Sequence, residues 1–182
     1  MASPPTVSTI PAPLSRLIAT SQVPLTLAAP NGRDFPLVAA NAAFERLTGY
    51  EQSDLLGRDC RLLQGVRTQP AARAALRHAL DEGLEGQAVI TNYRRNGEEF
   101  GNFVFLNAIS TKEGTAYVLG SQFEIAVEDR TRSFERHGEF LLNALDEVEK
   151  ALGDGYLLER ELLSRHDRRA LVRRRLRNWA LS

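Results

Sequence analysis

Three consecutive segments near the middle of the chain are rich in β-branched and aromatic residues, and two short turns separate them. The segments run from Ala88 to Arg94, from Glu99 to Ser110 and from Thr115 to Ile125. The turns, Arg95-Asn96-Gly97 and Lys112-Glu113-Gly114, have the length and the glycine that join antiparallel neighbours in a hairpin. This pattern predicts three antiparallel strands in sequence order.

Two more strands and several short helices are predicted before these three strands. The strands are Pro24 to Ala28 and Pro36 to Ala40, and a helix follows from Asn41 to Gly49. Ser53 and Asp54 are expected to cap a further turn, and Pro70 opens a helix that ends near Gly83. The fold class is therefore α+β, a five-stranded antiparallel sheet with short helices on one face and room for a pocket beneath them.

Both ends of the chain are predicted to carry helices outside this domain. Leu14, Leu17 and Ile18 fit a short amphipathic helix, which we expect to form an N-terminal cap within residues 1–22. The main domain is then expected over 23–127 and a C-terminal helical extension over 128–182. The apolar positions of the extension recur at steps of three, four or seven: Phe134, Leu141, Leu145, Val148 and Leu152. A second helical stretch is predicted after Gly153-Asp154-Gly155.

Composition excludes several classes of protein. Lys and Arg together number 23, as do Asp and Glu, so the balanced charge gives no general attraction to nucleic acid or to a membrane surface. The chain has no run of about 18 apolar residues, no signal peptide pattern, and one cysteine, and we therefore expect a water-soluble, cytoplasmic protein. The three histidines lie far apart, so no metal site is expected.

The segment from Gly57 to Gly65, which reads Gly-Arg-Asp-Cys-Arg-Leu-Leu-Gln-Gly, carries the chemistry that stands out. It places the thiol of Cys60, the fixed cation of Arg61 and the amide of Gln64 within one or two turns of chain. A lone cysteine most often packs as a small hydrophobic residue, so the thiol alone indicates little.

This segment resembles the signature of the LOV (light, oxygen, voltage) photosensor family, a branch of the PAS fold, whose motif typically reads Gly-x-Asn-Cys-Arg-Phe-Leu-Gln-Gly. The resemblance extends over roughly residues 23 to 125. The other matching positions are Asn41-Ala42-Ala43-Phe44, Leu47-Thr48-Gly49-Tyr50, Arg77, Asn92-Tyr93, Gly97, Asn102, Gly120 and Gln122. Three positions depart from the pattern: Asp59 replaces the common Asn, Leu62 replaces Phe, and Gly101 stands where Trp is frequent.

The resemblance implies a blue-light photoreceptor that holds flavin mononucleotide (FMN) without a covalent bond in the dark. Cys60 would then form a reversible adduct with the flavin C4a atom on illumination. Such a photocycle turns over no substrate, so the protein is not expected to be an enzyme. Arg61 and Arg77 correspond to the phosphate-binding positions, for which planar guanidinium groups are well suited.

The other family positions imply the remaining contacts with the flavin. Asn92 and Asn102, ten residues apart across a hairpin, can point to one face and meet the alternating donors and acceptors of the pyrimidine edge. Gln64 would reach the ribityl chain, and Gln122 would lie beside N5 and O4 and change its hydrogen bonds when N5 is protonated. The apolar slot would be lined by Leu63, Val104, Leu106 and Val118. Asp59, a carboxylate beside Cys60, is expected either to raise the thiol pKa or to restrain Arg61.

Output is expected through the terminal helices, with a homodimer whose association depends on light, or through a separate signalling partner. An alternative is a light-regulated DNA-binding or partner-binding regulator, because eight arginines and two carboxylates lie between Arg160 and Arg177. No clean recognition helix is found there, so nucleic acid is not the favoured partner. A flavin redox enzyme, or a PAS module without photochemistry in which Cys60 is structural, remain as rival interpretations.

Overall fold

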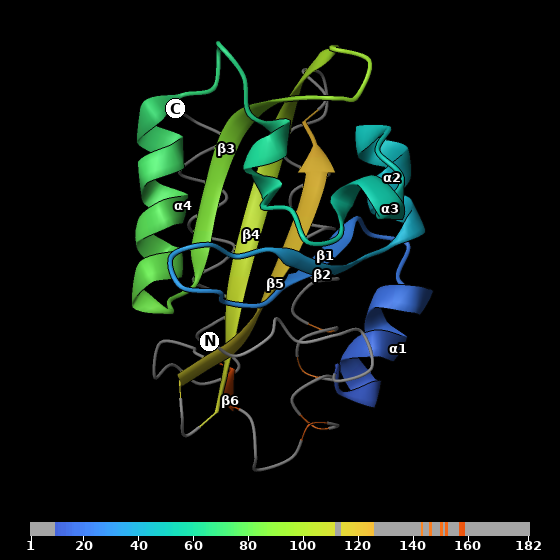
Figure 1. Ribbon diagram of the computed structural model, residues 1–182, viewed down its shortest axis with the longest axis vertical. Coiled ribbons are helices and arrows are strands. Elements are labelled where there is room, and N and C mark those ends of the chain that lie inside the picture. The colour runs from blue at the N-terminus through green and yellow to red at the C-terminus, as the bar shows by residue number, and fades with distance from the viewer. Residues whose placement is uncertain are drawn as a thin grey trace.

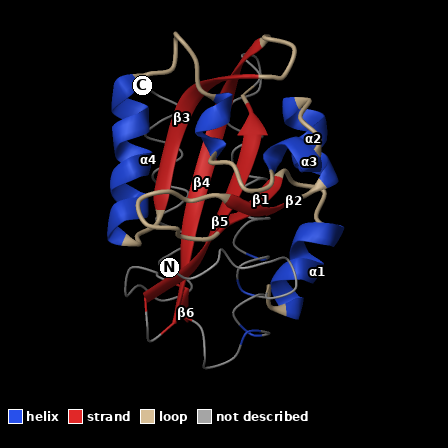
Figure 2. Cartoon of the chain, viewed as in Figure 1, coloured by secondary structure: helices blue, strands red, loops and turns tan. Residues whose placement is uncertain are grey.

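The computed structural model describes residues 10–111 and 114–125, together with Asn143, Asp146, Lys150, Leu152 and the pair Leu157–Leu158. Its helices are α1 (Ala12–Thr20), α2 (Ala42–Thr48), α3 (Gln52–Leu55), the 3-10 helix η2 (Cys60–Leu63) and α4 (Pro70–Glu82). Its strands are β1 (Leu25–Ala28), β2 (Leu37–Ala40), β3 (Gly86–Tyr93), β4 (Glu99–Thr111), β5 (Gly114–Glu124) and β6 (Leu157–Leu158). Figures 1 and 2 show how these elements are arranged.

The sheet has the strand order β2-β1-β5-β4-β3, and all of its neighbours are antiparallel. The predicted five-stranded α+β fold is confirmed. The hairpin of β3 and β4 pairs Ile90 with Asn102, and β4 pairs Val104 with Gln122 of β5. Because side chains alternate along a strand, Asn102, Val104 and Gln122 lie on one face of the sheet.

Local sequence signals place the helix ends where they were predicted. The Asn41 side chain accepts a hydrogen bond from the Phe44 backbone N–H and caps α2, which Gly49 ends with a φ of 73°. Pro70 opens α4. The predicted capping of α3 by Ser53 and Asp54 is wrong, because both residues lie inside the helix.

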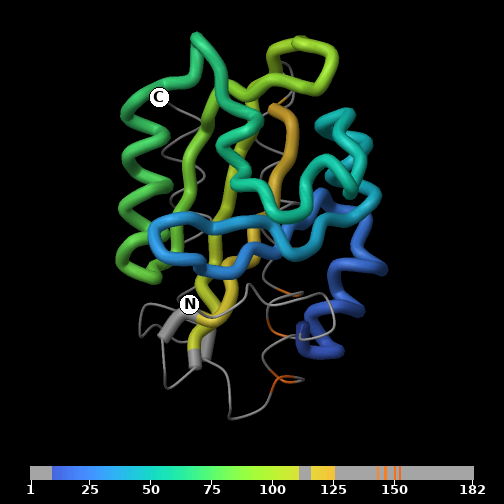
Figure 3. Tube along the Cα trace, viewed as in Figure 1, coloured from blue at the N-terminus to red at the C-terminus, as the bar shows by residue number. Residues whose placement is uncertain are grey.

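Different helices pack on the two faces of the sheet. On the outer face, Leu14 and Ile18 of α1 join a buried cluster with residues of the sheet such as Phe103 and Leu119, so the predicted N-terminal cap helix is present. On the inner face, α4 lies along β3 and β4, while α2 and α3 lie toward β1 and β2 (Figure 1). Figure 3 shows the loop between β1 and β2 crossing this inner face toward α4.

The C-terminal predictions fall mostly outside the described residues. These include the apolar positions Phe134, Leu141, Leu145 and Val148, and the arginines between 160 and 177. Asn143, Asp146, Lys150 and Leu152 are helical, and Leu152 packs against the outer cluster. The second helical stretch predicted after Gly155 is wrong at its start. Leu157 and Leu158 instead form β6, which pairs with Ser110 and Ile109 of β4 beyond the end of β3.

Candidate functional site

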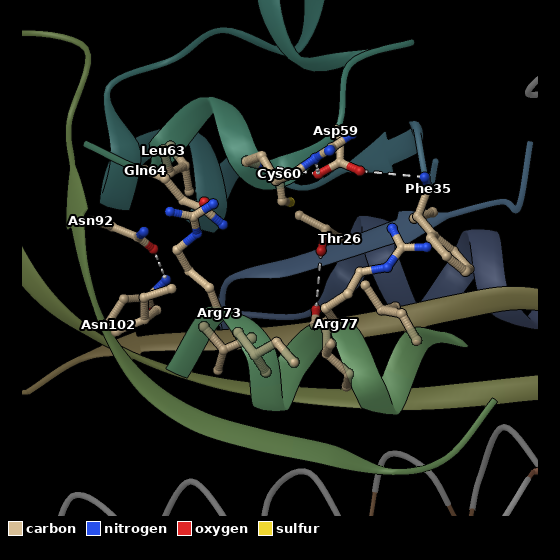
Figure 4. A pocket seen from close by; sticks show the side chains of 18 of the residues that line it. Thr26, Phe35, Asp59, Cys60, Leu63, Gln64, Arg73, Arg77, Asn92 and Asn102 are labelled. Atoms are coloured by element: carbon tan, nitrogen blue, oxygen red, sulfur yellow. Dashed lines mark hydrogen bonds and ion pairs between the residues drawn. The ribbon is translucent and has the colours of Figure 1, made fainter. Parts of the chain in front are cut away.

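A cavity of about 480 Å³ lies between the inner face of the sheet, η2 and α4. Its size is that of a pocket for a small organic ligand. The structure brings all eleven predicted site residues to its wall: Cys60, Arg61, Leu63, Gln64, Arg77, Asn92, Asn102, Val104, Leu106, Val118 and Gln122. Figure 4 shows the cavity with most of its lining side chains.

Cys60 begins η2, and its sulfur points toward Thr26 of β1 (Figure 4). The Thr26 hydroxyl is placed to donate to this sulfur. Burial, and then the charge of Asp59, raise the pKa of the Cys60 thiol to about 12, although the bond from Thr26 acts in the opposite direction. The sulfur therefore holds its proton at neutral pH, and this site supplies a neutral thiol rather than a thiolate.

Asp59 acts on both of its neighbours, Cys60 and Arg61. Its Oδ1 accepts the Arg61 backbone N–H at 2.9 Å and caps η2, and its Oδ2 accepts the Phe35 N–H at 3.3 Å. Its Oδ1 also forms an ion pair with Nε of Arg61 at 3.1 Å. The carboxylate thus restrains Arg61 and raises the pKa of Cys60 at the same time.

The two predicted arginines are held at the cavity by acidic neighbours. The Arg61 guanidinium bonds Asp34 as well as Asp59, and these charges raise its pKa, the Asp59 charge most of all. Arg77 bonds both carboxylate oxygens of Asp81 and also donates to the carbonyl of Arg33 at 2.6 Å, in the loop between β1 and β2. Both guanidiniums keep exposed surface, so they can meet a charged group at the mouth of the cavity.

Asn92 and Asn102 form a polar pair deep in the cavity. Asn102 Nδ2 donates to Asn92 Oδ1 at 2.9 Å, so the two side chains share one face, as the hairpin spacing predicted. The Oδ1 atom of Asn102 is buried and has no partner among the described residues. A buried acceptor without a hydrogen bond is costly, so this atom marks a place where a ligand donor fits.

Gln122 presents a second acceptor of the same kind. Its Nε2 donates to Thr26 Oγ1 at 3.3 Å, while its Oε1 is buried and has no partner in the described part of the chain. Gly120, on the same face of β5, leaves room for this contact: a Cβ atom there would lie 2.5 Å from Thr26 Oγ1 and 2.8 Å from Gln122 Nε2.

Sequence reasoning missed two polar residues of the cavity. Thr26 carries a hydroxyl on a strand whose other residues are apolar, and alternation along β1 places it on the inner face with Ala28. Arg73 lies four residues before Arg77, hence on the same face of α4. Its side chain extends from α4 at the cavity (Figure 4), and no ion pair involves it among the described residues.

The lining residues fit a flavin. An apolar wall suits the ring system, and the structure adds Ala28, Phe35, Leu37, Ile90 and Leu80 to the four predicted apolar residues. The unpartnered acceptors of Asn102 and Gln122 suit a heterocycle edge that carries N–H groups. Three arginines near the mouth suit a phosphate.

Among the described residues, no helix combines the length and apolar character of a membrane span, and no three acidic, His or Cys side chains gather into a metal site. Both findings concern residues 10–111 and 114–125 and the few described positions beyond them.

Known proteins resemble this chain in sequence and in structure. The PAS domain family matches residues 24–132. A blue-light-activated histidine kinase of Rhizobium johnstonii is 36% identical over 136 residues, which are 73% of this chain and 39% of the kinase. The chain spans about a quarter to two fifths of the length of the first curated relatives that it matches.

Solved structures of LOV proteins superpose on the whole domain. The LOV protein of Rhodobacter sphaeroides has 31% identity and a TM-score of 0.78, over 92% of this chain and 95% of that one. The LOV domain of a blue-light-activated histidine kinase of Erythrobacter litoralis has 36% identity and a TM-score of 0.55, over 57% of this chain and 96% of that one.

Proposed function

Because this chain belongs to the LOV family of blue-light photoreceptors within the PAS superfamily, we propose that it binds FMN without a covalent bond in the dark and reacts with it through Cys60 on illumination. The observation that carries the proposal is the position of the Cys60 thiol. It lies in the wall of a cavity that is also lined by the unpartnered acceptors of Asn102 and Gln122.

The flavin would supply blue-light absorption and an excited ring that a thiol can attack. Cys60 would supply both the sulfur that bonds the ring carbon C4a and the proton that N5 takes up, so no external oxidant or reductant would be needed. The raised pKa of Cys60 supports this step, because a thiol that keeps its proton brings both the sulfur and the proton to the reaction. The same bond would break thermally in the dark, and we infer that this photocycle turns over no substrate.

Different residues of the cavity contact different parts of the flavin. Arg61 and Arg77 bind the phosphate with paired donors, and Gln64 contacts the ribityl chain. Asn92 and Asn102 meet the pyrimidine edge. Leu63, Val104, Leu106 and Val118 pack on the ring and exclude water.

Absorption spectra of the purified protein before and after blue light test this proposal. We expect a yellow protein whose blue absorption bleaches and recovers in the dark. The Cys60→Ala variant should bind flavin and fail to bleach in this way. A variant that still bleaches reversibly through a covalent flavin adduct, or a wild-type protein that binds no flavin, would refute it.

For the output, we propose that Gln122 exchanges its hydrogen bonds when N5 is protonated and that this alters the contacts of β5 with the terminal helices or with a second copy of the chain. The buried Oε1 of Gln122 supports this, because rotation of the amide gives that atom a new partner. We also infer a cytoplasmic homodimer whose association depends on light and which passes the signal to a separate protein. Equal mass by light scattering in dark and light would contradict the change in association.

A further inference from the structure

The hydroxyl of Thr26 lies where three groups of the cavity meet. Gln122 Nε2 donates to Thr26 Oγ1 at 3.3 Å, the carbonyl oxygen of Gly120 lies 3.5 Å from Thr26 Oγ1, and the Cys60 sulfur points toward the Thr26 side chain. Thr26 is 3% exposed, so these contacts are shielded from water. Figure 4 shows Thr26 beside Cys60.

A hydroxyl has one proton to donate and two lone pairs to accept with. With Gln122 Nε2 as its donor, Thr26 can give its own proton to the Cys60 sulfur or to the Gly120 carbonyl. If the amide of Gln122 rotates, its Oε1 faces Thr26 instead, and only a proton from Thr26 can then satisfy that oxygen at this contact. The Thr26 hydroxyl can therefore form a hydrogen bond with either orientation of the Gln122 amide. It has only one proton, however, so it cannot donate to the Cys60 sulfur and to Gln122 Oε1 at the same time.

We propose that Thr26 is a positioning residue that couples the state of Cys60 to the orientation of Gln122. This inference rests on the proposed function. While the thiol is free, Thr26 accepts from Gln122 Nε2 and holds the sulfur in place. Once the sulfur is bonded to carbon, the Thr26 hydroxyl can donate its hydrogen bond to Gln122 Oε1, and the rotated amide is stabilised because that buried oxygen then has a partner.

Gly120 makes this arrangement possible. Thr26 of β1 lies directly opposite Gly120 of β5, and any side chain at position 120 would start 2.5 Å from Thr26 Oγ1. The contact between Thr26 and Gln122 thus crosses from one strand to the other at a place where the sequence has no side chain. A change at Gln122 is in this way transmitted to both β1 and β5.

The first test uses the flavin-free protein and the variants Thr26→Val and Thr26→Ser. Cys60 is the only cysteine, so the rate of its alkylation by iodoacetamide at pH 9 reports on this thiol alone. Loss of the hydroxyl removes a hydrogen bond that favours the thiolate, so we expect Thr26→Val to react about three- to fivefold more slowly. Thr26→Ser keeps the hydroxyl and should stay within about twofold of wild type. Equal alkylation rates in all three proteins would contradict a hydrogen bond from Thr26 to the Cys60 sulfur.

The second test uses the flavin-loaded protein and a double-mutant cycle with Gln122→Leu. We expect Gln122→Leu to change the dark recovery rate by about fivefold or more in the wild-type and Thr26→Ser backgrounds, and by less than about twofold in the Thr26→Val background. Equal effects in all three backgrounds would overturn the coupling while leaving the photocycle intact. A wild-type protein that does not bleach would instead refute the proposed function, and the coupling with it.

Discussion

Asn102 donates its side-chain Nδ2–H to Oδ1 of Asn92 over 2.9 Å, and its own Oδ1 is left buried with no partner among the described residues. The pair spans adjacent strands, since Asn102 lies opposite Ile90 and Asn92 lies opposite Phe100. Asn92 is 4% exposed and Asn102 1%. The polar end of the cavity is therefore buried and has an unpartnered acceptor before any ligand enters.

Asn102→Leu should lower flavin affinity about tenfold or more, because a ligand N–H loses the free acceptor and Asn92 loses its partner. In the flavin-free protein the free energy of unfolding should change by only about 1 kcal/mol, because one unsatisfied atom replaces another. Flavin titration and urea unfolding measure the two effects.

Asn107→Leu is the matched control for this substitution. Asn107 lies on the opposite face of the same strand, is 6% exposed, and also has a buried Oδ1 without a partner among the described residues. This variant should leave flavin affinity unchanged. Similar losses of affinity in both variants would show that Asn102 acts through stability alone.

Arg73→Ala should weaken FMN binding about tenfold and leave riboflavin binding nearly unchanged, because riboflavin lacks the phosphate that the guanidinium would meet. Arg61 and Arg77 are already held by carboxylates, whereas no ion pair involves Arg73 among the described residues. Arg67→Ala is the control, since Arg67 bonds Glu99 and does not line the cavity. Equal losses for FMN and riboflavin in Arg73→Ala would contradict a phosphate contact.

Asp59→Asn should lower the pKa of Cys60, because the carboxylate charge is the second cause of the shift, after burial. The pH profile of Cys60 alkylation in the flavin-free protein should therefore move to lower pH and not return to the ordinary value near 9. Asp34→Asn removes another carboxylate bonded to Arg61 and should leave the profile in place. An unchanged profile in Asp59→Asn would contradict this account of the shift.

Because the pKa of Cys60 is raised in the folded protein, the stability of the fold should depend on pH in the alkaline range. A thiol whose pKa is higher in the folded state favours folding while it holds its proton, and that contribution is lost as pH rises. The free energy of unfolding of wild type relative to Cys60→Ala should be constant below about pH 9 and should fall between pH 9 and about 12. Urea unfolding of both proteins across this range measures the difference, and a constant difference would contradict it.

The parts of the fold that were predictable from sequence are those that local signals specify. The hairpin of β3 and β4 and the cap of α2 by Asn41 depend on residues close together in the chain. The pairing of β6 with β4 was not predictable, because Leu158 meets Ile109 across nearly fifty residues and its local pattern favours a helix.

In the candidate site, too, local sequence signals identified some residues, while others reach the cavity only through tertiary packing. The segment around Cys60 and the positions of the resemblance led to eleven cavity residues. Thr26 and Arg73 were missed because an isolated hydroxyl on a strand and an arginine on a helix are ordinary on a surface. Only the packing of β1 beside β5, and of α4 on the sheet, brings them to the cavity.

Leu152→Ala should lower the free energy of unfolding by about 1–2 kcal/mol, less than for a fully buried leucine, because Leu152 is partly buried against the outer cluster. If this contact is made within one chain, the loss in melting temperature should be the same at all protein concentrations. If it is made between two copies, the loss should grow on dilution. Lys150→Ala, at an exposed helical position two residues earlier, should have little effect. Unchanged stability of Leu152→Ala at every concentration would contradict a role for this contact in docking the C-terminal helix on the sheet.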